Sequence, residues 1–424
     1  MTTHVQTPAT AQSRSASAAP TRTYTNAELA ALEHKFTAPN YDPLRAVLTT
    51  GNGVWVHDVE GRKYLDMLAG YSALSFGHQH PRIMDAFFNQ AKRLTVVSRA
   101  FENDQLGPMA QELCAFTGFE QVLPMNTGAE AIESAIKTAR KWAYLKKGVA
   151  KDQAEIIACT ANFHGRTTTV ISMSSTPQYK DFFGPLTPGF KLIPFGDLNA
   201  LKNAITKNTC AFLVEPLQAE GGVHIPPEGY LRECAQVCKQ NNVLFICDEV
   251  QTGFGRTGKD FAWQWDGESA RPDILALGKA LGGGVYPISA ILSSREIFSV
   301  FKAGDHGSTF GGNPLGAAVA REVIKVMRDE KISERAEKTG QWIREHLRAI
   351  KSRKIKEIRG RGMLNGIEVH PEAGDAHHFV ELLLKECVLC KETAKQVIRI
   401  TPPIVITQEE AEWGLERIAK VLGD

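Results

Sequence analysis

The chain has 424 residues, of which 43% are hydrophobic and 23% charged, and its formal net charge is +2. This length is enough for two domains, and so small a net charge argues against a nucleic-acid-binding protein. No apolar run approaches the ~20 residues that a membrane-spanning helix needs, and eight cysteines do not make a disulfide scaffold in so long a chain. We expect a soluble protein of the cytoplasm, or of the mitochondrial matrix if its first residues are a transit peptide.

The N-terminal part of the sequence contains few motifs that indicate catalysis or binding. Residues 1–24 are rich in Ala, Ser and Thr and contain no acidic residue, which predicts a disordered leader. Thr25 and Glu28 have the spacing of a capping box, so a helix is expected to begin there. His78 and His80 have no further metal ligands near them in the sequence, so we predict a turn and no metal site.

A helix with a candidate anion site follows. Thr127 and Glu130 have capping-box spacing, and apolar residues recur behind them at helical intervals up to Trp142. The free backbone N–H groups at such a helix start, beside Gly128, are suited to a phosphate. Many helices begin in this way and bind nothing, so the motif has little weight alone.

From residue 155 onward, short apolar runs alternate with helical patterns. The runs predict strands at residues 155–159, 191–195, 211–214, 243–247, 274–277 and 287–292. Such an order indicates an α/β fold with a mostly parallel sheet covered by helices on both faces. Later runs at 355–358, 363–369 and 397–400 predict a smaller α+β domain. The expected limits are a leader at 1–24, an N-terminal segment at 25–71, a large domain at 72–330 and a small C-terminal domain at 331–424.

Reactive side chains follow the predicted strands. Ligands of parallel sheets bind at the carboxyl ends of the strands, so these side chains are expected to converge on one edge. They are an aromatic residue, an arginine, carboxylates, an amide and a lysine: Phe163, Arg166, Glu215, Glu220, Asp248, Gln251 and Lys279.

Two cationic residues in this pattern allow more than one interpretation. Lys279 follows a buried strand, where desolvation favours the neutral, nucleophilic amine; a surface lysine is the simpler interpretation of that segment alone. Arg399 lies within an apolar strand and needs a carboxylate, which is either a protein side chain or a substrate.

Two further motifs are expected to be structural. The segment Gly253-Phe-Gly-Arg-Thr-Gly258 matches the dinucleotide fingerprint, but Asp248 and Glu249 precede it and no helical pattern follows, so we reject a nicotinamide oxidoreductase. The pair Cys387-Val-Leu-Cys390 is assigned to helix packing, with a redox pair or half of a metal site as the lesser alternative.

A lysine, a strand-end aspartate, an aromatic residue and a helix N-terminus together suit pyridoxal 5'-phosphate. The lysine holds the cofactor's aldehyde as a Schiff base, the aspartate keeps the ring nitrogen protonated, and the freed lysine then serves as a general base. A non-catalytic protein of the same fold would be expected to lack the lysine or the aspartate, and both are present.

The motifs resemble the class III (subgroup II) aminotransferases of fold type I, from about Tyr41 to Val421. The matching segments are Asn126-Thr-Gly-Ala-Glu130, Phe163-His-Gly-Arg166, Asp248-Glu-Val-Gln251, Leu277-Gly-Lys279 and Gly307-Ser-Thr-Phe-Gly-Gly-Asn-Pro314. The resemblance implies the fold type I architecture, pyridoxal phosphate, and a homodimer, or a larger assembly of dimers, with shared active sites.

The resemblance also implies roles for individual residues. Lys279 and Asp248 are expected to act on the cofactor, and Glu220 on substrate choice. The remaining cofactor contacts are expected from Gly128, Ala129, Phe163 and Gln251, with Ser308 and Thr309 reaching the phosphate bound by the neighbouring subunit.

Within the family, the segments Asn40-Tyr41-Asp-Pro-Leu44, Ser98-Arg-Ala-Phe101 and Leu123-Pro-Met-Asn126 resemble those of the ornithine δ-aminotransferases. The resemblance implies that Tyr41, Tyr71 and Arg166 bind ornithine, while Glu220 pairs with Arg399 and releases it for 2-oxoglutarate. The alternative is an aminotransferase for acetylornithine, 4-aminobutyrate or a diamine, against which Tyr41, Tyr71 and Glu220 argue. Ala219 and His164 depart from the subfamily pattern, which has a glycine and frequently a larger aromatic residue there.

Overall fold

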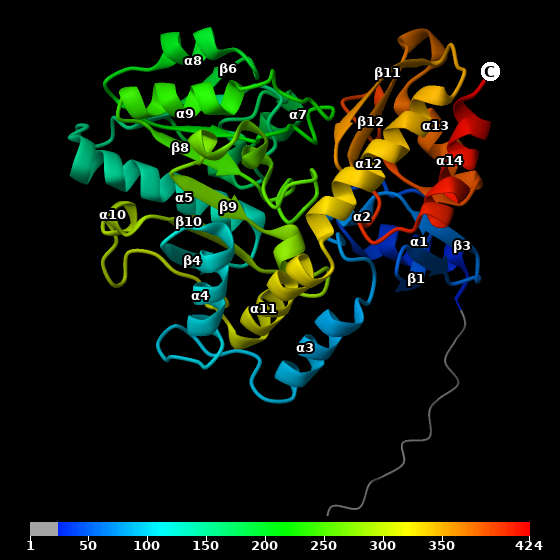
Figure 1. The fold of residues 1–424 in the computed structure, drawn as a ribbon, viewed down its shortest axis with the longest axis horizontal. Helices are drawn as coiled ribbons and strands as arrows, with labels where there is room; N and C mark the ends of the chain where they lie inside the picture. The colour runs from blue at the N-terminus through cyan, green and yellow to red at the C-terminus, as the bar shows by residue number, and fades with distance from the viewer. Residues whose placement is uncertain (1–23) are drawn as a thin grey trace, which may run out of the picture.

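The computed structural model describes residues 24–424, which form two lobes lying side by side (Figure 1). The larger lobe contains a seven-stranded sheet, and the smaller lobe contains two four-stranded sheets. Two long helices, α11 (Pro314–Asp329) and α12 (Ile332–Ala349), run in succession from the larger lobe to the smaller one. The predicted leader lies outside the described residues except for Tyr24, and the predicted domain limits stay predictions.

The seven-stranded sheet has the order β4-β10-β9-β8-β7-β5-β6. Its strands from β9 to β6 are parallel, whereas β10 is antiparallel to both of its neighbours. The strand bounds are β4 Gln121–Met125, β5 Glu155–Cys159, β6 Phe190–Ile193, β7 Thr209–Val214, β8 Leu244–Asp248, β9 Ile274–Leu277 and β10 Ser289–Ser293. The mostly parallel sheet is thereby confirmed.

The edge strand β4 is the one strand of this sheet that the sequence patterns do not predict. It contains Pro124 and ends three residues before helix α5 begins at Gly128. Proline is tolerated here because β4 pairs only with β10 and leaves its other edge without a strand.

Both faces of the sheet are covered by helices. Phe212 and Phe245 pack in the apolar core that includes helix α9 (Tyr230–Gln240), and their strand neighbours Leu213 and Ile246 pack in the core of α5 (Gly128–Trp142). Each such fully buried side chain contributes about 1.5–3 kcal/mol to folding. The remaining helices are α1 Asn26–Phe36, α2 Ala69–Ser72, α3 Pro81–Ala91, α4 Leu106–Thr117, α6 Thr168–Ile171, α7 Pro177–Lys180, α8 Leu198–Ala204, α10 Arg295–Phe298, α13 Ala376–Lys385 and α14 Gln408–Leu422.

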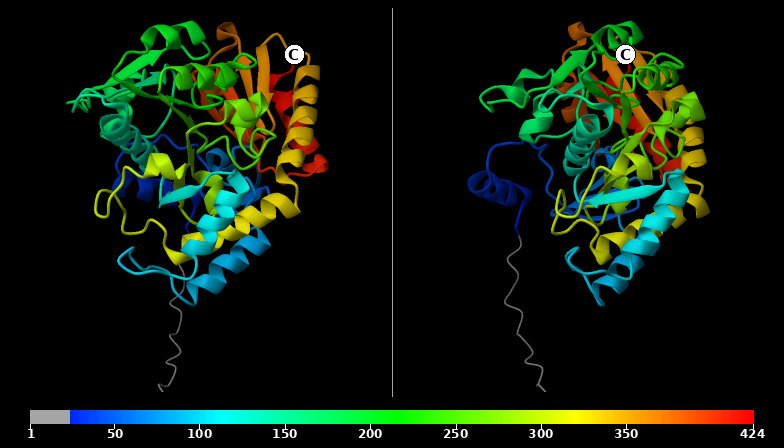
Figure 2. Two further views of the ribbon diagram at one scale, coloured as in Figure 1. Left: turned by 60° about the vertical axis from the view of Figure 1, so that its left-hand side comes forward. Right: turned by 90° about the vertical axis from the view of Figure 1, so that its left-hand side faces the viewer.

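The N-terminal helix α1 stands off from the body of the molecule in the right-hand view of Figure 2. Its predicted capping box is confirmed, since Thr25 and Glu28 bind each other's backbone N–H groups. None of its residues is buried, and the side chains of Phe36 and Tyr41 are 74% and 80% exposed. The packing of α1 on the rest of this chain therefore contributes little to its stability.

The smaller lobe joins the two ends of the described chain. One sheet has the order β1-β2-β3-β13, in which β13 is parallel to β3; the other is antiparallel, with the order β11-β12-β15-β14. Their bounds are β1 Leu48–Asn52, β2 Trp55–Asp58, β3 Lys63–Asp66, β11 Ile355–Arg361, β12 Leu364–Val369, β13 Val388–Leu389, β14 Lys391–Thr393 and β15 Val397–Ile400. The smaller α+β unit expected from the sequence is confirmed and also includes residues 48–66.

The assignment of Cys387 and Cys390 to a helix is wrong. Strand β13 lies between them and pairs with β3, so the spacing reflects a short strand with a buried residue at its end. Burial raises the pKa of the Cys390 thiol, which keeps it protonated and unreactive. All eight cysteines are free, and residues 24–424 contain no group of three or more side chains suited to a metal ion.

The glycine-rich segment 253–258 forms turns, and no α-helix follows it; the next element is a short 3₁₀ helix, Ala262–Asp266. This confirms the rejection of a dinucleotide site. The order of the residues also predicts that Asp248 and Glu249 both lie where a pyrophosphate would approach. This is wrong for Glu249, which is turned away from the sheet edge. Its carboxylate accepts hydrogen bonds from Thr252 Oγ1 at 2.5 Å and Trp263 N at 2.8 Å.

Arg256 of the same segment connects the two lobes. Its guanidinium is fully buried and donates to the carbonyl oxygens of Met363 and Pro402, at 3.2 and 2.6 Å, and to Ser75 Oγ at 3.0 Å. Burial lowers its pKa to about 9. The segment thus fastens the larger lobe to the smaller one.

The buried carboxyl of Glu249 makes stability depend on pH. Burial raises its pKa from 4.5 to about 7, so between these values the folded protein binds a proton that the unfolded chain does not. Stability contributed by this group is therefore lost as pH rises through that window, by about 3 kcal/mol at most.

We expect Glu249→Gln, which keeps the size and both hydrogen-bonding positions of this side chain, to remove this loss of stability at rising pH. The free energy of unfolding of the variant relative to the native protein should increase from pH 4.5 to pH 7 in denaturant titrations. Glu416→Gln, at a side chain that is 78% exposed, controls for the change in net charge. Parallel pH curves for the native protein and Glu249→Gln would contradict the prediction.

Candidate active site

A cavity of about 190 Å³ lies where the carboxyl ends of the parallel strands meet the first turn of α5. All six residues predicted to bind the cofactor within one chain, or to act on it, line this cavity. They are Gly128, Ala129, Phe163, Asp248, Gln251 and Lys279. The convergence on one edge of the sheet follows from the parallel strand order.

Lys279 directly follows β9 and Gly278. Its own φ is 43°, a left-handed conformation that costs a residue with a side chain roughly 1 kcal/mol and recurs at functional sites. The remaining exposed surface of Lys279 faces the cavity, and its Nζ makes no hydrogen bond or ion pair with residues 24–424. Burial lowers the pKa of Lys279, while the negative charges of Glu220 and Asp248 oppose the shift. The result is an amine that loses its proton more readily than a surface lysine.

Asp248 is the last residue of β8 and is 5% exposed. Its Oδ1 accepts a hydrogen bond from Val250 N at 3.0 Å, and its Oδ2 lies 2.7 Å from His164 Nδ1. The carboxylate is therefore held at both oxygens while it lines the cavity.

Apolar side chains from different strands line the cavity, among them Phe163, Leu217 and Val250. Phe163 follows β5, and Val250 follows β8. Val250 also explains why position 128 is a glycine, because a Cβ added there would lie 2.7 Å from Val250 Cγ1. Val250 lies within the motif Asp248-Glu-Val-Gln251 but was given no role, although its position two residues after Asp248 places it on the same side of an extended chain.

The first turn of α5 forms another wall. Thr127 and Glu130 make the predicted capping box, which occupies the N–H groups of Thr127 and Glu130. The N–H groups of Gly128 and Ala129 have no acceptor within residues 24–424, and the helix dipole favours an anion beside them.

Glu215 is a cavity residue that the sequence analysis placed at this edge without giving it a role. It follows β7, accepts a hydrogen bond from Phe163 N at 3.0 Å, and lines the cavity. Burial, and then the negative charge of Asp248, raises its pKa well above the usual value. This carboxyl is therefore protonated more readily than an exposed glutamate, and in its neutral form it does not compete with Asp248 for a cation.

Glu220 and Arg399 form an ion pair beside this cavity. Arg399, on β15 of the smaller lobe, is 2% exposed, and its guanidinium lies 4.9 Å from the centre of the Tyr71 ring. Tyr71 is turned toward it by a run of left-handed residues, Ala69–Ser72. The carboxylate that Arg399 was expected to need is thus a protein side chain in this structure.

The backbone of Glu220 is also fastened to the smaller lobe. Thr393 Oγ1 donates to the carbonyl oxygen of Glu220, and Arg359 donates to the carbonyl oxygens of Gly222 at 2.7 Å and Val223 at 3.1 Å. The methyl group of Ala219 packs in an apolar cluster and does not line the cavity, so it does not narrow it.

The other predicted residues lie outside the cavity. Arg166 is exposed and stacks 3.7 Å above the ring of Tyr179, while Tyr41 is almost wholly exposed. Ser308 Oγ accepts a hydrogen bond from Asn126 Nδ2 at 2.7 Å, and Thr309 is exposed. The roles predicted for these four residues stay predictions.

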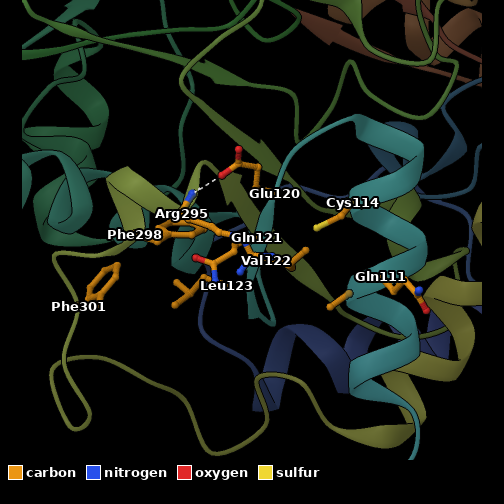
Figure 3. Close-up of a pocket in the computed structure, with 10 residues that line it drawn as sticks. Gln111, Cys114, Glu120, Gln121, Val122, Leu123, Arg295, Phe298 and Phe301 are labelled. Atoms are coloured by element: carbon orange, nitrogen blue, oxygen red, sulfur yellow. Dashed lines mark hydrogen bonds between the residues drawn. The ribbon is translucent and has the colours of Figure 1, made fainter.

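A second cavity, of about 590 Å³, lies between α4, β4 and α10 (Figure 3). It is lined by Cys114, Arg295, Phe298 and their neighbours and includes none of the predicted site residues. Burial raises the pKa of Cys114, so this thiol is a poor nucleophile. The candidate active site is therefore the cavity at Lys279.

The residues of the Lys279 cavity fit pyridoxal phosphate. An amine without a partner is available for an aldehyde, a fixed carboxylate for a ring nitrogen, and two apolar side chains for the faces of a ring. The free N–H groups of Gly128 and Ala129 are suited to a phosphate.

Comparisons with known proteins agree with this site. The family model for class-III aminotransferases matches residues 36–422. An ornithine aminotransferase of Geobacillus is 54% identical over 394 residues, which cover 93% of this chain and 98% of that protein. A crystal structure of ornithine aminotransferase from Toxoplasma gondii, in which PLP partially occupies the active site, has a TM-score of 0.92 and 46% identity, covering 95% of each chain.

The chain is also similar to an aminotransferase that is named for a different substrate. The structure of acetylornithine aminotransferase from Elizabethkingia anophelis has a TM-score of 0.86 and 44% identity, covering 94% of this chain and 99% of that one. The family model and these identities over nearly the whole chain lead to one conclusion. The chain belongs to the class-III aminotransferase family.

Proposed function

We propose that the protein is a pyridoxal-phosphate-dependent aminotransferase that moves the δ-amino group of L-ornithine to 2-oxoglutarate, giving glutamate 5-semialdehyde and glutamate. The observation that carries this proposal is the Glu220–Arg399 ion pair beside the cavity of Lys279 and Asp248. The names of relatives that are more than 50% identical support it.

The cofactor, when bound, supplies an electron-withdrawing ring that stabilises the charge left on a substrate carbon after it loses a proton. Asp248 provides the carboxylate for the ring nitrogen, and Phe163 and Val250 provide its apolar walls. Lys279 Nζ takes the proton from the δ-carbon of ornithine, a role for which its lowered pKa is suited. The carbon that loses the amino group becomes an aldehyde and the keto carbon of the acceptor becomes an amine, so no external oxidant is needed.

The Glu220–Arg399 pair supports the choice between two substrates of different charge. With the pair formed, Arg399 offers no free cation, so a donor bound through a carboxylate at that place is disfavoured, and ornithine is bound at its α-carbon end by Tyr41 and Arg166. When Glu220 turns away, the carboxylate of 2-oxoglutarate replaces it on Arg399. A buried arginine left without any partner would cost several kcal/mol, so the exchange discriminates strongly.

The second candidate function is acetylornithine aminotransferase, favoured by the similarity to the Elizabethkingia structure. The aromatic ring of Tyr71 lies over Arg399 and argues against acetylornithine as the substrate. The part of the site beside this ring would have to admit the larger, acylated chain.

We also propose that the active protein is a homodimer with Ser308 and Thr309 contacting the phosphate held by the partner subunit. Exposed apolar side chains support an interface: Phe36, Tyr41, Phe101 and Phe310 are 74%, 80%, 70% and 49% exposed. Single chains seldom expose this many large apolar side chains unless another surface covers them.

Replacement of the lysine tests the proposed chemistry. Lys279→Ala should lower the rate of ornithine conversion by at least about 100-fold, the usual contribution of a general base. It should also lose the visible absorption of the native protein with cofactor. Retained activity, or a native protein that binds no pyridoxal phosphate, would contradict the proposed function.

The specificity switch predicts a gain of function. Glu220→Ala should raise kcat/KM for donors bound through Arg399, such as α-amino acids or 4-aminobutyrate, about 10- to 100-fold relative to ornithine. Glu392→Ala is the matched control, since it removes a nearby carboxylate that pairs with His377 and Lys391. Equal selectivity in Glu220→Ala and the native protein would count against the switch.

The assembly is tested by mass in solution. Light scattering at concentrations where the protein is fully active should give at least twice the 46.5 kDa of one chain. Ser308→Ala together with Thr309→Ala should weaken cofactor binding without changing that mass. A fully active species with the mass of one chain would exclude shared sites.

A further inference from the structure

We propose that His164 is a positioning residue, which donates a hydrogen bond from its ring to Asp248 and so fixes this carboxylate for the cofactor's ring nitrogen. The inference rests on the proposed function and assigns a role to a side chain that only appeared as a departure from the subfamily pattern.

The contact between His164 and Asp248 is short and shielded from solvent. His164 Nδ1 lies 2.7 Å from Asp248 Oδ2, and the exposed fractions of the two side chains are 0% and 5%. The other ring nitrogen, Nε2, is buried and has no partner within residues 24–424. A second proton on the ring would therefore create a buried cation with an unsatisfied donor, which is far more costly than a lone pair without a partner. We therefore assign the ring proton to Nδ1, from which it is donated to Asp248.

A neutral donor suits this place better than a cationic one. Hydrogen bonds donated to a carboxylate favour its charged form. An arginine or lysine in the place of His164 would form an ion pair with Asp248 and compensate its charge. Neutral imidazole leaves the whole negative charge available to a protonated ring nitrogen in the cavity.

Among residues 24–424, Asp248 has one other anchor. Val250 N donates to Oδ1 at 3.0 Å, while the His164 contact holds Oδ2. Since the terminal torsion of an aspartate is soft, one contact leaves the plane of the carboxylate free to turn, and the second removes that freedom.

The loop of His164 is held on each side of this residue. Asn162 Nδ2 donates to the carbonyl oxygens of Cys159 and Met173, and Phe163 N donates to Glu215 Oε2 at 3.0 Å. Gly165 packs so closely on α5 that an added Cβ would lie 3.0 Å from the Cβ of Ala129. One rigid loop therefore supplies both a wall of the cavity, Phe163, and the donor to Asp248.

A matched pair of variants separates donation from packing. His164→Asn places an amide nitrogen at the same number of bonds from the backbone as Nδ1 and keeps the donor. His164→Leu fills the space and has no donor. Thermal unfolding of both proteins without cofactor reports whether the fold is intact.

The readout is cofactor binding, measured as the dissociation constant of pyridoxal phosphate and as the pH dependence of its visible absorption when bound. His164→Leu should weaken binding about 10- to 100-fold, the range expected for one hydrogen bond to a charged group, and should shift the pH dependence of the spectrum. His164→Asn should restore both to within a few-fold of the native protein. In an Asp248→Asn background, His164→Leu should have little further effect, because the two residues act as a unit.

Native binding and spectra in His164→Leu, or equal defects in the Leu and Asn variants, would overturn this inference while leaving the proposed function intact. If the native protein itself binds no pyridoxal phosphate, the proposed function fails first.

Discussion

Burial of the seven-stranded sheet on both faces is the constraint from which the site follows. The central strands are apolar along their whole length, so charged side chains find space only where the strands end. Four of the five parallel strands, β5, β7, β8 and β9, each contribute a residue at or shortly after their carboxyl end. Phe163, Glu215, Asp248 and Lys279 are far apart in the sequence and become neighbours because of strand order alone.

Charge at this edge is kept in balance by burial and pairing together. Three carboxyl groups, from Glu215, Asp248 and Glu220, lie near two cations, Lys279 and Arg399. Glu215 is pushed toward its neutral form, and Glu220 is paired with Arg399. Asp248 is held by hydrogen bonds from His164 and from Val250 N, and Lys279 is an amine without a partner among residues 24–424. The two groups that the proposed chemistry requires are therefore those whose charges the protein leaves uncompensated.

Much of this arrangement could be predicted from the sequence because its signals are local. Apolar runs gave six of the seven strands of the large sheet, and capping residues gave the start of α5. Pairings between distant segments could not be predicted: β13 pairs Val388 with Leu65, and no local pattern links those residues. The opposite orientations of Asp248 and Glu249 were predictable, since adjacent residues of an extended chain point to opposite sides. The position of Tyr71 was not, because four successive left-handed residues with a single glycine contradict local preference.

The attachment of the Glu220 segment has a consequence for how the proposed exchange of substrates proceeds in time. Its backbone is bound to the smaller lobe through Thr393 and Arg359, and Arg399 belongs to that same lobe. The ion pair therefore moves as one body with its support, and backbone displacement would not separate it. Separation requires rotation about the side-chain bonds of Glu220, a motion intrinsically faster than the rearrangement of a loop. The rate at which the site changes from one substrate to the other is then limited by the breaking of one ion pair, and the backbone around that pair stays in place.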